Sequence, residues 1–292
     1  MTAQARFHLH ANGPFDHAAV MANLSSHAVT GLHDFDATTQ QFSRWINISG
    51  TQQWVQLKLA DDGVLVTTDS PDSSINSGVA ARVKHWFDLD TDLSDINAHL
   101  RRDDIFSQQV KERPGIRIVR HQAPFEGAIL AVLAQQVTLA TGRLFAARLV
   151  EAYGNTPTAG APLRMFPSAK AIASISLDEL RATLKLTNSR AKTIHEVAQF
   201  FADRGYQAEH VQLPAADELS TVYGIGPWTL AVLAIRSAGD KDAFPTSDAV
   251  LRRMMKASEP RLGQDSKHDE ARISTWSPYR SYAAQRLWAS AQ

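Results

Sequence analysis

Apolar and polar residues alternate with period two along much of the first third of the chain. The clearest examples are residues 46–48 and 55–59, and such segments are typical of half-buried strands. Turn residues at 61–63 (Asp-Asp-Gly) lead into a further apolar stretch at 64–66, which predicts a hairpin. Apolar residues at helical spacing between 79 and 87 predict a helix beside the strands. We therefore expect an α+β N-terminal domain, an antiparallel sheet with helices.

The spacing of apolar residues becomes helical in the rest of the chain. They recur every three or four residues in stripes from Phe125 to Val137, from Leu144 to Leu149 and from Ile194 to Phe201. The segment 111–115, which ends in Pro-Gly, interrupts the pattern between the two regions. We therefore predict two domains, an α/β N-terminal domain at residues 1–113 and an all-helical domain at 114–292.

The composition agrees with two globular domains. The 292 residues are 44% apolar, which is enough to fill two cores. There is no cysteine, which excludes disulfides, a thiol nucleophile and a cysteine-ligated iron–sulfur cluster. No apolar run reaches the roughly twenty residues that a membrane span needs, and the first residues lack the apolar run of a signal peptide. We expect a cytoplasmic protein.

The net charge of zero conceals an uneven distribution. Residues 1–113 hold 9 Lys/Arg and 14 Asp/Glu, a net charge of −5, and residues 114–292 hold 21 and 16, a net charge of +5. A basic surface on the C-terminal part suits a nucleic-acid partner, although an excess of this size also arises by chance. The distribution is therefore compatible with DNA binding without requiring it.

A glycine hairpin, Gly224-Ile225-Gly226, lies between two helical patterns within residues 215–236. Glycines let a backbone approach a ligand closely, and free N–H groups at a helix N-terminus form an anion site that fits a DNA phosphate. Pro227 suits the first turn of the second helix, where a missing N–H costs nothing. The alternative is an ordinary turn between two helices. We predict a helix-hairpin-helix motif that binds phosphate, with Thr229 in its second helix.

Asp248 follows Trp228 by twenty residues and precedes another helical segment. Its local role could be to cap that helix, which Ser247 could also do. A carboxylate held beneath a sugar has another use, because breaking an N-glycosidic bond builds positive charge on the sugar. The same group can orient or deprotonate the attacking water. The reacting base must leave the DNA helix, so this chemistry requires a pocket for a flipped nucleotide.

The hairpin and the downstream aspartate together resemble the helix-hairpin-helix superfamily of DNA glycosylases. This resemblance implies that Asp248 is the catalytic residue and faces the flipped nucleotide. Members that also cleave the DNA backbone carry a lysine nucleophile where this chain has Trp228, and tryptophan cannot form the required imine. Because cysteines are also absent, the chain most resembles the monofunctional 3-methyladenine DNA glycosylase II family. The resemblance extends over most of the chain, including residues 125–137 and 279–288.

The resemblance also implies a pocket for alkylated purines, which carry a positive charge. The electron-rich face of an indole attracts such bases, so Trp228 is expected to form a pocket wall. The alternative is a core tryptophan of the second hairpin helix. Tyr279 stands where the family has a pocket tryptophan, Val232 stands where one member has a pocket tyrosine, and Phe125 is expected in the same pocket. These differences leave the aspartate chemistry intact but bear on the range of lesions.

Further DNA contacts are expected from two segments. Gln135 and Gln136 are polar residues at the end of an apolar helix, and they are either its polar edge or a contact with the minor groove. The resemblance makes Gln136 the candidate to fill the gap left by the flipped base. Arg190 begins another helix and is either a phosphate ligand or part of a solvated face.

Metals and cofactors are not expected to take part in the chemistry. His8 and His10 share one face of a strand and could hold a metal, but the sequence shows no cysteine or carboxylate that completes a recognisable ligand pattern. We therefore predict no metal site and no cofactor. A monovalent cation at the hairpin carbonyls, as in family members, would help a phosphate to dock.

The sequence thus predicts a monofunctional DNA glycosylase that excises alkylated purines such as 3-methyladenine or 7-methylguanine and leaves an abasic site. The expected partner is duplex DNA containing alkylated bases, with no membrane partner, and the protein is expected to be a nucleoid-associated monomer. The alternative is a non-catalytic helix-hairpin-helix DNA-binding protein. Asp248 distinguishes the two, because a binding module needs no carboxylate facing the sugar. A bifunctional glycosylase with lyase activity is disfavoured by Trp228.

Overall fold

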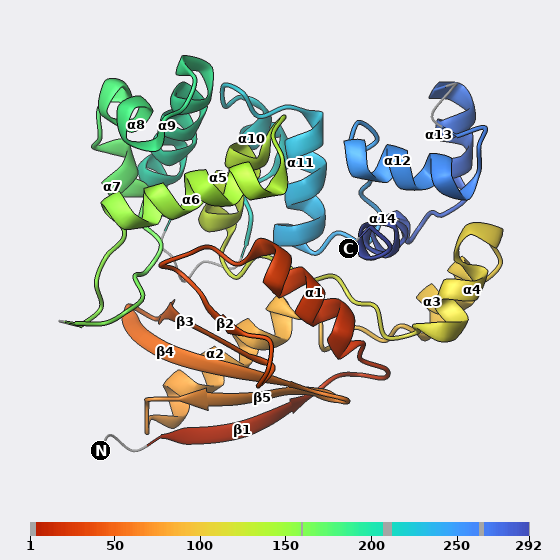
Figure 1. Ribbon diagram of the computed structural model, residues 1–292, viewed down its shortest axis with the longest axis horizontal. Coiled ribbons are helices and arrows are strands. Elements are labelled where there is room, and N and C mark those ends of the chain that lie inside the picture. Colours follow the sequence, from red (N-terminus) through yellow and green to blue (C-terminus); the bar gives the residue numbers. More distant parts are fainter. Residues whose placement is uncertain (1–3, 159, 207–211, 263–265, 292) are drawn as a thin grey trace.

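The computed structural model describes residues 4–158, 160–206, 212–262 and 266–291 (Figure 1). Its N-terminal part contains a five-stranded sheet in the order β1-β5-β4-β3-β2. The strands are β1 (Ala5–His10), β2 (Asp34–Asp36), β3 (Gln41–Ile48), β4 (Thr51–Ala60) and β5 (Gly63–Thr68). All neighbouring strands are antiparallel, which confirms the sheet predicted from the sequence.

Alternation of apolar residues explains which face of the sheet is buried. Along β4, Val55, Leu57 and Leu59 are buried and the residues between them are more exposed. β5 follows after a turn of two residues, because Ala60 pairs with Gly63. Two helices, α1 (His17–His27) and α2 (Ser73–Trp86), share a hydrophobic core with the sheet. α2 contains nearly all of the helix predicted over residues 79–87.

The rest of the chain is helical, as predicted. The helices are α3 (Ser94–Leu100), α4 (Asp104–Glu112), α5 (Pro124–Ala134), α6 (Leu139–Tyr153), α7 (Ala169–Ala173), α8 (Leu177–Leu184), α9 (Asn188–Asp203), α10 (Ala216–Ser220), α11 (Pro227–Leu233), the π-helical segment η1 (Ala234–Ala238), α12 (Ala249–Ser258), α13 (Ser266–Ser274) and α14 (Arg280–Ala289). Within the described ranges, none of the helices is long and apolar enough to cross a membrane.

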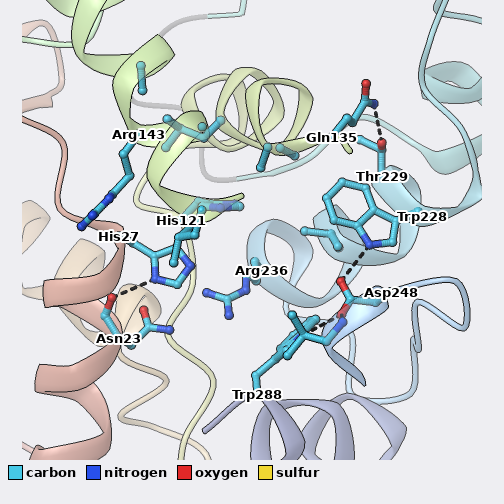
Figure 2. Close-up of a pocket in the computed structure, with 18 of the residues that line it drawn as sticks. Asn23, His27, His121, Gln135, Arg143, Trp228, Thr229, Arg236, Asp248 and Trp288 are labelled. Carbon is cyan, nitrogen blue, oxygen red and sulfur yellow. Dashed lines mark hydrogen bonds between the residues drawn. The ribbon is translucent and has the colours of Figure 1, made fainter. Parts of the chain in front are cut away.

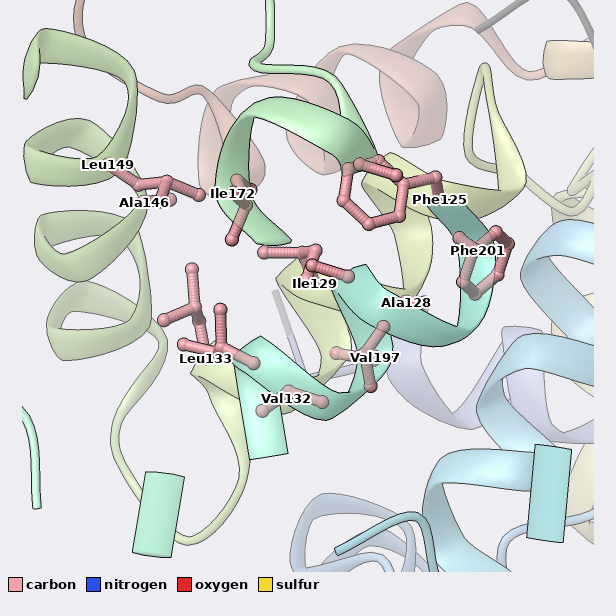
Figure 3. Packing of buried hydrophobic residues seen from close by; sticks show 14 of the residues in the cluster. Phe125, Ala128, Ile129, Val132, Leu133, Ala146, Leu149, Ile172, Val197 and Phe201 are labelled. Atoms are coloured by element: carbon pink, nitrogen blue, oxygen red, sulfur yellow. The ribbon is translucent and has the colours of Figure 1, made fainter. Parts of the chain in front are cut away.

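Helix α5 forms the centre of the larger helical core. Nine of its eleven residues are buried, which explains why its sequence is apolar on nearly all sides. Figure 3 shows its side chains packed against those of α6, α7 and α9. The contacting residues include Ile129 and Leu133 of α5, Leu149 of α6, Ile172 of α7 and Val197 of α9. The helix therefore connects most of the elements that surround it.

A second helical core combines segments that lie far apart in the sequence. Helices α3 and α4 pack with α12, α13 and α14, and Figure 1 shows this group beside the rest of the molecule. Its buried residues include Leu100 and Phe106 from the early helices, Tyr282 and Leu287 from α14, and Trp276 from the segment between α13 and α14. The packing thus does not divide at residue 113, because the apolar faces of α3 and α4 are covered by C-terminal helices.

A buried ion pair joins the sheet to α5. The Arg44 guanidinium of β3 donates two hydrogen bonds to the Glu126 carboxylate, with N–O distances of 2.8 and 2.7 Å. The Gln122 side chain donates another hydrogen bond to Glu126, and Arg44 also contacts His33. Burial alone would raise the pKa of Glu126, but the charge and hydrogen bonds of Arg44 hold that pKa below its ordinary value. The charged form of the pair is therefore favoured at neutral pH.

Candidate active site at the junction of the two halves

A groove of about 1350 Å³ lies where the N-terminal sheet domain meets the helices. Its walls come from α1, the C-terminal end of α5, the glycine hairpin, the start of α12 and the end of α14. Figure 2 shows the labelled lining residues Asn23, His27, His121, Gln135, Arg143, Trp228, Thr229, Arg236, Asp248 and Trp288. Trp228 and Asp248, selected from the sequence, thus face the same groove.

Asp248 is both the helix cap and a lining residue of the groove. Its Oδ1 accepts hydrogen bonds from the backbone N–H groups of Val250 and Leu251, at 3.0 and 2.9 Å, and so caps α12. The residue is 9% exposed. The capping alternative raised by the sequence is therefore correct, and it does not compete with a site role, because Oδ2 takes no part in the cap.

Two indole N–H groups also point at the Asp248 carboxylate. Trp228 Nε1 donates to Oδ2 at 2.9 Å, and Trp288 Nε1 donates to Oδ1 at 3.3 Å (Figure 2). An ionised carboxylate accepts hydrogen bonds only, so four surrounding donors match the charged form. Because Oδ1 has three donors and Oδ2 has one, Oδ2 is the oxygen with capacity left for a ligand in the groove.

Trp228 occupies the first turn of α11, directly after Pro227. Its ring is half-buried, packs at the edge of the α5-centred core and lines the groove. The sequence left open whether Trp228 is a core residue or a pocket wall. The structure shows it in contact with both the core and the groove. Val232, one turn further along α11, also lines the groove.

Trp288 is a groove residue whose role the sequence did not reveal. It lies in α14, and the Arg236 guanidinium sits 4.9 Å from the centre of its ring. It closes the segment 279–288 that carries the family resemblance, but no spacing rule showed that its ring would reach Asp248. Only the packing of α14 against α12 places the two side chains together.

The groove continues past Asp248 into a compartment with histidine and arginine side chains. Burial, and then the nearby charge of Arg236, lower the pKa of His121 to about 3, so this imidazole is neutral at neutral pH. Its Nδ1 lies 3.0 Å from the Ser237 hydroxyl. Burial lowers the pKa of Arg236 to about 10, and the negative charge of Asp248 opposes that shift. Arg236 is therefore still charged at neutral pH.

The two hairpin positions carry glycine for different structural reasons. Gly224 has φ +79°, and a Cβ there would collide with the Thr193 side chain of α9, so this position requires glycine. Gly226 has φ −106°, and a Cβ there would meet nothing within 4 Å. Among the described residues, the Gly226 N–H has no protein acceptor, whereas the Ile225 N–H donates to Val222. The Gly226 amide is therefore available to a ligand.

Other residues predicted to bind DNA make contacts that hold the hairpin. Ile225 and Thr229 are buried, so their side chains do not face solvent. The Gln135 amide donates to the Gly224 carbonyl and to the Thr229 hydroxyl, both at 3.0 Å (Figure 2). Arg190 donates to the Gln135 carbonyl. These contacts fix the hairpin against the end of α5.

Gln136 is positioned differently from its neighbour. It follows the end of α5, is exposed, lines the groove and has φ +53°. Residues other than glycine seldom adopt this left-handed conformation, and such strain often accompanies functional sites. The residue therefore lies at the solvent-exposed part of the groove lining.

Two residues predicted for the pocket do not line the groove. Phe125 is buried in the helical core, where its ring contacts those of Phe166 and Phe201. Tyr279 immediately precedes α14, and its ring meets the edge of the His99 ring of α3. The first turn of α5 faces the core and Tyr279 contacts α3, so neither side chain joins Asp248 in the groove lining.

Two family models match the chain. Residues 129–278 match the HhH-GPD superfamily base excision DNA repair protein, and residues 6–122 match the AlkA N-terminal domain. The chain therefore belongs to the HhH-GPD superfamily of base excision DNA repair proteins.

The relatives that the chain matches differ in how much of their length it covers. The chain is 32% identical over 283 residues to the probable bifunctional transcriptional activator/DNA repair enzyme AlkA of Mycobacterium tuberculosis, covering 95% of this chain and 55% of that protein. It therefore spans about half the length of that relative. It is 28% identical over 212 residues, 70% of each chain, to the DNA-3-methyladenine glycosylase of Bacillus subtilis. A solved 3-methyladenine DNA-glycosylase from Archaeoglobus fulgidus shares the fold, with a TM-score of 0.81, 17% identity and 97% coverage of both chains.

Replacing Gly226 by alanine tests the hairpin amide. Because the added Cβ meets open space, the fold should be retained, and an unchanged melting temperature would show this. The methyl group would obstruct a phosphate at the amide, so affinity for damaged and undamaged duplexes should fall together, by about tenfold or more. Fluorescence anisotropy with both duplexes measures the effect. Unchanged affinity would mean that the hairpin is only a structural turn.

Proposed function

We propose that the groove receives a nucleotide flipped out of duplex DNA and that Asp248 catalyses hydrolysis of its N-glycosidic bond. The released base leaves an abasic site. The observation that carries the proposal is the Asp248 carboxylate, which lies beside two indoles in a groove that the glycine hairpin also lines. The relatives named DNA-3-methyladenine glycosylase support the same activity.

The chemistry follows from the arrangement around Asp248. Departure of the base leaves positive charge on the sugar, and the Asp248 carboxylate stabilises that charge. The cap and the two indole donors hold the carboxylate in place before the reaction, so little reorganisation is needed. Oδ2, with one hydrogen bond from Trp228, is the oxygen that would orient or deprotonate water.

The second part of the proposal is that water, and not an amine of the enzyme, attacks the sugar carbon. A lyase step requires an amine that attacks the sugar carbon. None of the described residues that line the groove is a lysine, and Trp228 stands at the first turn of α11, where the bifunctional members carry one. The product strand should therefore remain intact.

Cationic purines such as 3-methyladenine and 7-methylguanine are the proposed substrates. The half-buried ring of Trp228 lines the groove beside Asp248, and that of Trp288 lines it from α14. Their π faces attract a positively charged base, which is also a better leaving group than a neutral one. The Asp248 charge adds to this attraction.

Duplex DNA is the proposed partner. The Gly226 amide would bind a backbone phosphate, and Gln136 at the groove rim would occupy the gap left by the flipped base. A monovalent cation at the hairpin belongs to the same proposal. The Gly224 carbonyl is a candidate ligand for it, because the hydrogen bond from Gln135 uses one of its two lone pairs.

The activity can be tested on DNA treated with a methylating agent. We expect release of 3-methyladenine and 7-methylguanine, identified by mass spectrometry, and breakage of the product strand only after alkali is added. Borohydride should trap no covalent protein–DNA adduct, because no imine forms. Release of no base would contradict the enzymatic proposal, and a trapped adduct would contradict only its monofunctional part.

Substituting Asp248 by asparagine separates catalysis from capping. Asparagine also caps helices well, so α12 should be retained while the negative charge is lost. We expect base release to fall by about 10²- to 10³-fold, with DNA affinity unchanged within a few-fold. Asp242→Asn is the matched control, because Asp242 pairs with Arg280 at 2.9 Å and does not line the groove. Near-normal release by the Asp248 variant would show that Asp248 is not the catalytic group.

Two substitutions of Trp228 separate its hydrogen bond from its ring. Trp228→Phe removes the bond to Asp248 but keeps an aromatic face, so release of 7-methylguanine and of neutral hypoxanthine should fall by similar factors. Trp228→Ala also removes the face, and its additional loss should be several-fold larger for 7-methylguanine. Single-turnover release of each base gives these ratios. Equal additional losses for the two bases would show that the ring does not read charge.

A further inference from the structure

Three potential metal ligands meet at the edge of the N-terminal sheet, outside the groove. His8 and His10 lie on β1, two residues apart, so their side chains project from the same face of the strand. His10 pairs with Gly63 in the β1–β5 ladder, and the Ala11 N–H donates to the Asp62 carbonyl at 2.9 Å. The two-residue turn between β4 and β5 thereby places Asp62 beside both histidines.

The carboxylate that the sequence did not reveal is therefore supplied by the turn. His8 Nε2 lies 3.1 Å from Asp62 Oδ1, and His10 Nδ1 lies 2.9 Å from Asp62 Oδ2. One ligand atom from each of the three residues can be chosen so that all lie within 4.8 Å of one another. The two imidazole rings are 4.1 Å apart, centre to centre.

These separations fit a common cation. Zinc bonds to nitrogen and oxygen of about 2.0–2.1 Å in a tetrahedron separate neighbouring ligand atoms by roughly 3.3 Å. The imidazole–carboxylate distances are close to that value, so small side-chain rotations would be enough to admit an ion. Two histidines and one carboxylate are a recurrent ligand set for zinc and related transition metals.

We propose that His8, His10 and Asp62 bind a divalent transition-metal ion of the zinc class, with water completing its coordination. The side chains are 32%, 67% and 60% exposed, so an ion can reach them from solvent. The bound ion connects the edge strand β1 to the β4–β5 turn. Its role is therefore to stabilise the N-terminal sheet, and it is independent of base release at the groove.

Zinc titration of untagged, chelator-treated protein tests the proposal. Isothermal titration calorimetry should detect one Zn²⁺ per chain in the wild type, and saturating Zn²⁺ should raise the melting temperature. The substitutions Asp62→Asn and His10→Ala should each weaken binding at least tenfold and abolish the rise. Circular dichroism verifies that the variants are folded.

The neighbouring pair His17–Asp61 provides the control. Its atoms lie 3.4 Å apart, and Asp61 occupies the same turn as Asp62. Asp61→Asn should bind Zn²⁺ like the wild type. Absence of binding to the wild type, or equal affinity in folded wild type, Asp62→Asn and His10→Ala proteins, would overturn the assignment. Cobalt provides a second readout, because Co²⁺ at the site should give visible absorption that is lost in the Asp62→Asn variant.

Discussion

The bidentate ion pair between Arg44 of β3 and Glu126 of α5 is the contact on which the position of the candidate site depends. Both side chains are almost fully removed from water. Removing one partner from such a pair typically costs about 3–5 kcal/mol, because the other is left charged and buried. The pair anchors the first turn of α5 to the sheet. At the other end of the helix, the Gln135 side chain donates hydrogen bonds to Gly224 and Thr229. Helix α5 therefore fixes the position of the hairpin relative to the sheet.

Asp248 shows how the requirements of folding and of the proposed chemistry coexist in one carboxylate. One of its oxygens completes the N-terminus of α12, and the other receives the Trp228 indole and faces the groove. The cap fixes the rotamer, and the Trp228 indole supports the direction of the second oxygen. A residue with an ordinary structural role can thus also be a well-oriented group in a site.

The local sequence pattern was sufficient to predict the helices, the strands and the centre of the site. It was not sufficient to predict which residues each side chain contacts. Period-two and helical spacing predicted the sheet and helices, and the hairpin with its downstream aspartate predicted Trp228 and Asp248 in one place. Phe125 and Tyr279 were misplaced, because their orientation depends on which face of α5 and α14 meets another helix.

Residues brought together by long-range packing were also the ones missed. Trp288 reaches Asp248 only because α14 packs against α12, and Asp62 reaches His8 only through the β1–β5 register. Helices α3 and α4 join C-terminal helices for the same reason. The spacing of residues within one segment of the sequence does not predict contacts between distant segments.

The shifted pKa values of three groove residues keep the charge of each one constant around neutral pH. His121 and His33 have pKa values of about 3, and Arg236 has one of about 10. Between roughly pH 5 and pH 8 the two imidazoles stay neutral and the guanidinium stays charged. A nucleotide entering the groove thus meets these groups in one fixed charge state, whatever the acidity of the cell within those limits.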